Sequence, residues 1–176
     1  MTEWTHSIAL GLHILFAATF LGSNVFLEFL LSRRLALIPP GQAARLSERL
    51  GLDFAVLTWL SLVGMGATGA VLLWKDGLLE SLTYRKFYTS GYGSALVTMM
   101  GLWFTLVVAG AVITFFLRPR VSPKLPMDAT REEVDEARER GVRTAAWLRH
   151  LARYNLWASA LAVIVGGFLA LGGFFT

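Results

Sequence analysis

The chain contains no cysteine and little charge, and each shortage removes a group of functions. Without cysteine, the protein forms no disulfide, no thiolate-bound metal site and no cysteine-ligated iron–sulfur cluster. Only 16% of the residues are Asp, Glu, Lys or Arg, against about 25% in an average soluble domain. Any bound metal must therefore be held by histidine, methionine, carboxylate, hydroxyl or backbone oxygen.

The sequence also lacks the motifs of the common soluble enzymes. It contains no nucleotide-binding loop, no Ser-His-Asp set and no pair of carboxylates placed for acid–base catalysis. The sequence is instead rich in apolar residues, since 55% of its residues are hydrophobic.

The apolar residues gather in four blocks, at residues 8–31, 54–74, 94–117 and 156–175. Each block is about 20 residues long, which is enough for a helix to cross a ~30 Å hydrocarbon core. The pattern predicts an all-α integral membrane four-helix bundle, a single transmembrane domain over residues 1–176. We also expect short cytoplasmic helices in the connections, one of them at about residues 130–147.

Basic residues give the orientation. Thirteen of the 16 Lys and Arg residues lie in the first and third connections, and three lie in the second. The positive-inside rule then predicts a multi-pass protein of the cytoplasmic (inner) membrane with both termini outside. The basic loops account for the net charge of +4, so lipid and not nucleic acid is the expected partner. An electron-transfer partner and a homo-oligomer both stay open.

The first span carries polar residues along one side. At about 100° per residue, His6 and His13 point in nearly the same direction, Asn24 lies about 20° from His13, and Glu28 about 60°. Polar groups inside a span are costly and face the bundle interior. We therefore expect this stripe to face the other helices.

Depth divides the stripe into two sites. Glu28 and Asn24 lie toward the inner end of the first span, where the fourth span brings Arg153 and Asn155. We expect these four residues to form a structural polar layer that joins the two helices, with a proton-handling role as the alternative.

His13 lies in the outer half, about 8 Å deep, far from His150 at the opposite face. At its level the third span offers Met99 and Met100. His13 is either a metal ligand completed by Met99, Met100, water or a residue of the outer loop, or an interior histidine hydrogen-bonded to a hydroxyl or carbonyl. Each methionine is either a ligand or a filler of the core.

Three stretches resemble a known group of small four-helix bacterial membrane proteins. "HILFAATFLGSNVFLEFLLSRRL" has a histidine, a glycine nine residues later and then arginine, here His13, Gly22, Arg33 and Arg34. "VGMGATGAVLLW" and "RYNLWAS" are similar to stretches of the second and fourth helices, with Thr68, Gly69, Arg153 and Asn155. The group includes the copper-resistance D-type domain and the HemJ-type protoporphyrinogen oxidase.

The resemblance implies a haem b (protoporphyrin IX iron) inside the bundle, with His13 as an axial ligand. The chain also departs from the group. The third span has no lysine, which goes with haem binding and activity in the oxidase, and the chain carries fewer His and Met residues than copper-type domains often do. Because the second and third spans have no histidine, two bis-histidine haems are not expected.

The leading expectation is a membrane b-type haem protein with one haem in the outer half, serving electron transfer or redox chemistry on a small molecule or porphyrin. Whether it is a haem-dependent oxidoreductase is open. The alternatives are a copper- or metal-handling accessory protein and a non-catalytic bundle that acts through partner assembly.

Overall fold

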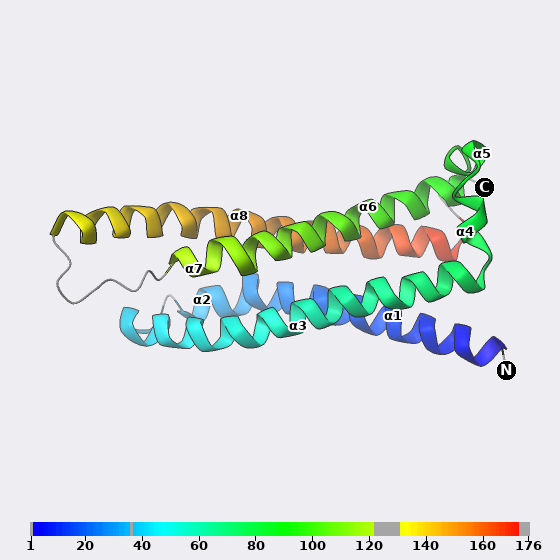
Figure 1. Cartoon of the computed structure of the whole chain (residues 1–176). Coiled ribbons are helices and arrows are strands. Elements are labelled where there is room, and N and C mark those ends of the chain that lie inside the picture. Colours follow the sequence, from blue (N-terminus) through cyan, green and yellow to red (C-terminus); the bar gives the residue numbers. More distant parts are fainter. Residues whose placement is uncertain (1, 36, 122–130, 173–176) are drawn as a thin grey trace.

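The computed structural model describes residues 2–35, 37–121 and 131–172, and this part of the chain contains helices and no strand (Figure 1). In chain order the elements are α1 (Thr2–Val25), η1 (Phe26–Leu31), α2 (Ser32–Leu35), α3 (Pro40–Lys75), α4 (Leu78–Ser81), α5 (Arg85–Tyr88), α6 (Gly91–Ala111), η2 (Val112–Leu117), α7 (Arg118–Val121) and α8 (Arg131–Ala170). The two η elements are π-helical segments.

Four of the resulting helices are long and apolar enough to cross a membrane: Trp4–Arg34, Arg49–Lys75, Gly91–Arg120 and Gly141–Ala170. Their outward faces carry large apolar side chains, among them Ile14, Val63, Phe104 and Phe115. A soluble monomer rarely exposes so much apolar surface. These helices confirm the expectation of an all-α, multi-pass membrane protein.

The helices before the second and fourth spans are not separate, as the sequence suggested, but belong to the spans themselves. α3 begins at Pro40 and α8 at Arg131, and both continue without a break to the far end of the bundle. Proline is tolerated in the first helical turn, and neither helix has one further on. With 40 residues, α8 is about 60 Å long. Residue 130, the expected start of the loop helix, lies outside the described residues.

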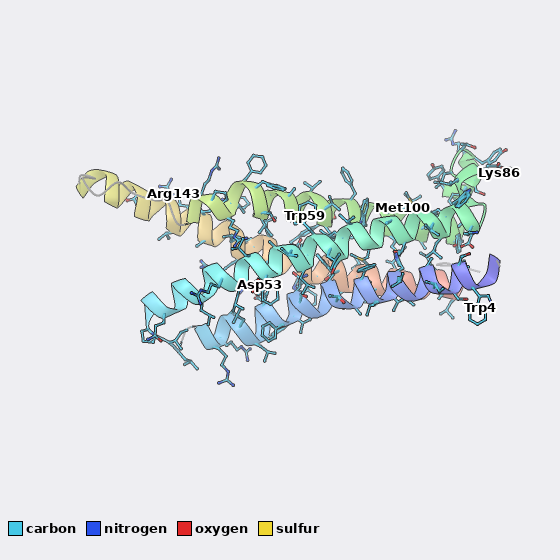
Figure 2. The ribbon with its side chains drawn as sticks, turned by 60° about the horizontal axis from the view of Figure 1, so that its bottom comes forward. Trp4, Asp53, Trp59, Lys86, Met100 and Arg143 are labelled. Atoms are coloured by element: carbon cyan, nitrogen blue, oxygen red, sulfur yellow. The ribbon has the colours of Figure 1, made fainter. Side chains whose placement is uncertain are left out.

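Each long helix packs mainly against two others. α1 packs against α3 and α8, and α6 packs against the same two helices. α1 therefore lies across the bundle from α6, and α3 lies across from α8. Figures 1 and 2 show the start of α1, with Trp4, and the α4–α5 connection, with Lys86, at one end of the bundle. We call this the terminal end, and we call the other, which carries α2 and α7 with their arginines, the basic end.

The centre of the bundle is filled by residues from all four long helices. The buried cluster consists of Phe20, Leu62, Met65, Leu106 and Ala158. Phe20 and Leu62 are among the largest fully buried side chains. All four long helices therefore pack together at the depth of this cluster.

Glycines in α3 let aromatic rings approach its backbone. A Cβ atom at Gly64 would lie 2.5 Å from the Phe16 ring, one at Gly66 would lie 2.6 Å from the Trp103 ring, and one at Gly69 would lie 3.4 Å from Cε1 of His13. Three glycines thus receive three rings, which is the close packing that small residues provide between membrane helices.

Candidate ligand site in the bundle

His13 is held against α3 by its Nδ1 atom. Nδ1 lies 3.1 Å from the carbonyl oxygen of Met65 and 3.0 Å from Oγ1 of Thr68. The ring also rests on Gly69, where the backbone has no side chain to displace it. The sequence allowed either a metal ligand or an interior histidine hydrogen-bonded to a hydroxyl or carbonyl. At Nδ1 the structure shows the second arrangement.

These contacts fix the tautomer of the ring. A carbonyl oxygen can only accept a hydrogen bond, so Nδ1 carries the hydrogen and donates it toward Met65. The Thr68 hydroxyl donates its own hydrogen to the carbonyl of Gly64 at 2.7 Å, so its oxygen also accepts from Nδ1. In the neutral ring Nε2 then keeps a free lone pair. Nε2 has no hydrogen-bond partner among the described residues.

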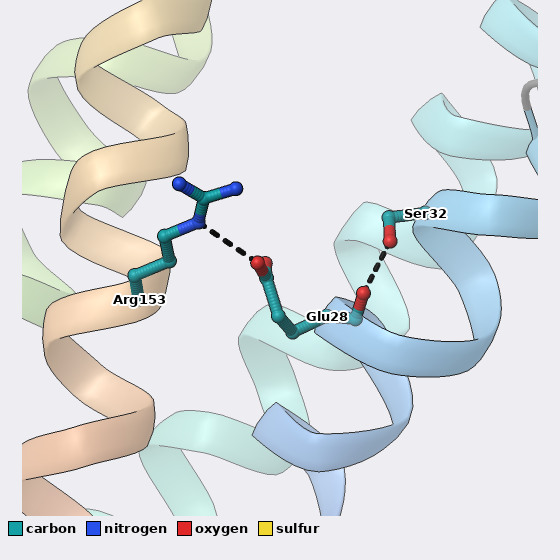
Figure 3. A network of polar contacts seen from close by, with 3 residues as sticks. All are labelled: Glu28, Ser32 and Arg153. Atoms are coloured by element: carbon teal, nitrogen blue, oxygen red, sulfur yellow. Dashed lines mark hydrogen bonds and ion pairs between the residues drawn. The ribbon is translucent and has the colours of Figure 1, made fainter.

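The polar layer at the basic end contains one ion pair between α1 and α8. Arg153 Nε donates to Glu28 Oε1 at 2.9 Å (Figure 3). Ser32 donates to the backbone carbonyl of Glu28 one turn earlier, which ties the end of η1 to α2. The Glu28–Arg153 contact expected from depth is therefore present.

The other two residues expected in this layer behave differently. Asn24 donates from Nδ2 to the carbonyl of Phe20 in its own helix at 2.8 Å, a local bond that short amide side chains form readily. Asn155 is buried, and its Oδ1 has no partner in the described part of the chain. Neither amide is bonded to the ion pair there, so the layer consists of a pair and not of four joined residues.

Met99 and Met100 lie on different sides of α6. Met99 is half-buried, and its Sδ would lie 3.9 Å from a Cβ placed at Gly166 of α8. Met100 is 40% exposed, on the side of α6 that faces away from the bundle. Of the two methionines, Met99 is the one that lies between helices.

Helix register gives the depth of the methionine sulfur. The Glu28–Arg153 contact sets α1 and α8 level with each other near the basic end. Thirteen residues from Arg153 along α8 lead to Gly166, and thirteen residues back along α1 lead to Leu15. The sulfur beside Gly166 is therefore within about two residues of the level of His13, or roughly 3 Å at 1.5 Å per residue.

Several polar contacts were not singled out by the sequence. His6 Nε2 lies 3.2 Å from Asp76 Oδ1 at the terminal end, and Trp59 Nε1 donates to Thr114 Oγ1 at 3.3 Å. Depth gave only a coarse signal for the Thr68 contact to His13, because Thr68 lies seven residues from the end of α3 and His13 lies eleven residues from the start of α1. The burial of Ser61, 1% exposed with an unpartnered Oγ, had no signal in the sequence.

Among the described residues, no group of three or more His, Cys, Asp or Glu side chains is placed to hold a metal ion. Protein-family models, curated proteins and solved structures include no match to the chain. The fold and the site thus define a class, a multi-pass helical membrane protein with a half-buried histidine held between two of its helices, and the functional argument rests on that histidine.

Proposed function

We propose that the protein is a b-type haem protein of the cytoplasmic membrane, with His13 as an axial ligand. One observation carries the proposal: Nδ1 of His13 is occupied by the Met65 carbonyl and the Thr68 hydroxyl, which leaves the Nε2 lone pair for a metal. Histidines that bind metals almost always donate their other ring hydrogen to a carbonyl, carboxylate or water in this way. These residues fit a metal-binding imidazole, because hydrogen bonds at Nδ1 already orient the ring.

The residues around His13 have separate tasks. The Met65 carbonyl and the Thr68 hydroxyl hold the tautomer and make the imidazole a better electron donor. Gly69 admits the ring beside the α3 backbone. Apolar helices exclude water, and axial ligands, burial and nearby hydrogen bonds are the means by which a protein adjusts a haem potential.

Haem iron would supply one-electron redox chemistry at this position. The chain would use that chemistry for electron transfer or for oxidation of a small molecule or porphyrin. Because the chain has no soluble catalytic motif, the substrate or electron partner would reach the site through the membrane or at the terminal end.

The same proposal includes an orientation. Arg33, Arg34, Arg118 and Arg120 gather at the basic end, which the positive-inside rule assigns to the cytoplasm. Both termini would then lie outside, and His13 would lie in the outer half of the membrane. Anionic lipid head groups of the inner leaflet are the partners that the basic end would meet.

A visible spectrum with metal analysis tests the proposal. The protein purified in detergent should show a Soret band, and His13→Ala should lose it while eluting as the same folded species in size-exclusion chromatography. His6→Ala and His150→Ala are matched controls and should keep the band. If His13→Ala does not fold, His13→Gln serves in its place, since glutamine keeps a hydrogen-bond donor for Met65.

Two results would contradict the haem proposal. A colourless, metal-free protein that stays so after incubation with haem would remove it. Copper bound without porphyrin would instead favour a metal-handling accessory protein.

A further inference from the structure

The chain contains two units with the same order of elements. The first has a helix, a six-residue π segment, a four-residue helix and a long helix: α1, η1, α2 and α3. The second repeats this order in α6, η2, α7 and α8. π-helix is rare, so two segments of equal length at the same point of two hairpins are a strong mark of repetition.

The two buried positions of α1 recur among the buried positions of α6, which has others besides. The π segments begin at Phe26 and Val112, which sets a shift of 86 residues. Among the described side chains, α1 buries only Ala9 and Phe20. The shift carries these onto Ala95 and Leu106, both buried in α6.

The contacts between the units are reciprocal. Glu28 of the first unit bonds Arg153 of the second, and the counterpart of Glu28, Thr114, accepts a hydrogen bond from Trp59 of the first. A two-fold interface has this property, since residue i meets j and j meets i. The pairing makes Trp59 the counterpart of Arg153, a shift of 94 residues between the long helices.

Burial in the long helices supports this second shift independently. The described buried residues of α3 are Ser61, Leu62 and Met65. The shift carries them onto Asn155, Leu156 and Ser159, which are all buried in α8. Ser61 and Asn155 are also the two residues whose buried side-chain oxygens have no partner in the described part of the chain.

The first shift has a direct consequence for the ligand site. It makes Met99 the counterpart of His13, and both are half-buried. It makes Met100 the counterpart of Ile14, and both are exposed on the outside of the bundle. α1 and α6 lie across the bundle from each other, and His13 and Met99 lie within about two residues of the same depth, roughly 3 Å at 1.5 Å per residue.

We propose that His13 and Met99 are the two walls of one site on an internal two-fold axis. The inference rests on the proposed function for the identity of the ligand: if the site takes haem, Met99 and not Met100 or water is the second axial ligand. His/Met ligation raises the haem reduction potential relative to ligation by two histidines. The repeat thus favours Met99 as the partner of His13, whereas depth alone allowed Met99, Met100, water or a residue of the outer loop.

The spectrum of the haem-loaded protein tests the ligand. The parent should be six-coordinate and low-spin, Met99→Leu should become high-spin with haem retained, and Met100→Leu should match the parent. Met99→His should restore a low-spin spectrum with a lower reduction potential, because two histidines then face the axis. A low-spin spectrum that persists in Met99→Leu, or that is lost in Met100→Leu, would overturn the assignment.

A second measurement needs no haem. Because the chain has no cysteine, the double variants His13→Cys/Met99→Cys and His13→Cys/Met100→Cys each carry only the intended pair. A short bismaleimide should join residues 13 and 99 within one chain, detected as linked peptides by mass spectrometry. It should join 13 and 100 far less, since position 100 is about 100° further around α6.

The two measurements separate the two proposals. Efficient cross-linking of 13 to 99 in a protein that never binds haem would support the shared site and remove the haem function. Equal cross-linking of both pairs would overturn the shared site whether or not haem binds.

Discussion

At the scale of single residues, the His13 ring is held by one hydroxyl and one backbone carbonyl of α3. Thr68 Oγ1 donates to the Gly64 carbonyl, and its oxygen receives the Nδ1 hydrogen of His13. The hydroxyl therefore links the backbone of α3 to the imidazole of α1. Because the Met65 carbonyl contacts the same hydrogen, the ring has two acceptors, and either one alone preserves the tautomer.

Thr68→Val should weaken the site without destroying it. The substitution keeps the shape of the side chain and removes one acceptor of the His13 hydrogen bond. Losing a hydrogen-bond partner of a metal-binding histidine costs about 10–100-fold in metal affinity. Haem retention during titration with an apoprotein acceptor should fall, while Thr68→Ser, which keeps the hydroxyl, should behave as the parent. Equal retention in both variants would show that Thr68 has no part in holding the ligand.

At the scale of the helix, the glycines of α3 allow aromatic rings of neighbouring helices to pack against its backbone. Gly64 and Gly66 receive the rings of Phe16 and Trp103, and Trp103 also donates from Nε1 to the Leu62 carbonyl at 3.0 Å. Two helices, α1 and α6, are thereby brought to α3 at one level. By contrast, a Cβ at Gly101 of α6 would meet nothing within 4 Å.

Gly64→Ala should destabilise the bundle and Gly101→Ala should not. At Gly64 the new methyl group would lie 2.5 Å from the Phe16 ring, and overpacking of this kind costs about 1–3 kcal/mol. At Gly101 the methyl group has room, so the helix gains up to about 1 kcal/mol from losing a glycine. Thermal unfolding in the same detergent should lower the midpoint of the first variant and leave that of the second unchanged or higher. A Gly64→Ala protein as stable as the parent would contradict the packing described for α3.

At the scale of the whole molecule, four spans put both termini on one side of the membrane. The proposed orientation can be checked with single cysteines, since the chain has none of its own. In intact cells a membrane-impermeant maleimide should label Glu80→Cys, at the terminal end, and should label Glu139→Cys, at the basic end, only after permeabilisation. The reverse pattern would invert the orientation and place His13 in the inner half.

Hydropathy and depth were enough to predict the coarse molecule. Four apolar blocks of about 20 residues indicated the four spans, because a helix must satisfy its own backbone in lipid. Counting residues from the ends of the spans predicted the contact between Glu28 and Arg153, because a rise of 1.5 Å per residue fixes depth along a straight helix.

Other features depend on three-dimensional contacts that the sequence pattern does not contain. The unbroken course of α8 was missed because the charged residues from Arg131 onward look like a separate loop helix. Asn24 turned to the carbonyl of Phe20 because a local bond competes with any partner on another helix. The repeated order of elements was also hidden, since the equivalent positions that share burial seldom share residue type.

The pairing of unlike residues at equivalent positions of the two proposed units has a consequence for how a flat ligand would bind. A bundle with identical halves would bind such a ligand equally well in two orientations related by the axis, and a population would contain both. Here Asn155 is the counterpart of Ser61, and Met99 is the counterpart of His13, so the two orientations would differ in energy. Two unlike units would therefore bind such a ligand in one preferred orientation, in which each face of the ligand meets different side chains.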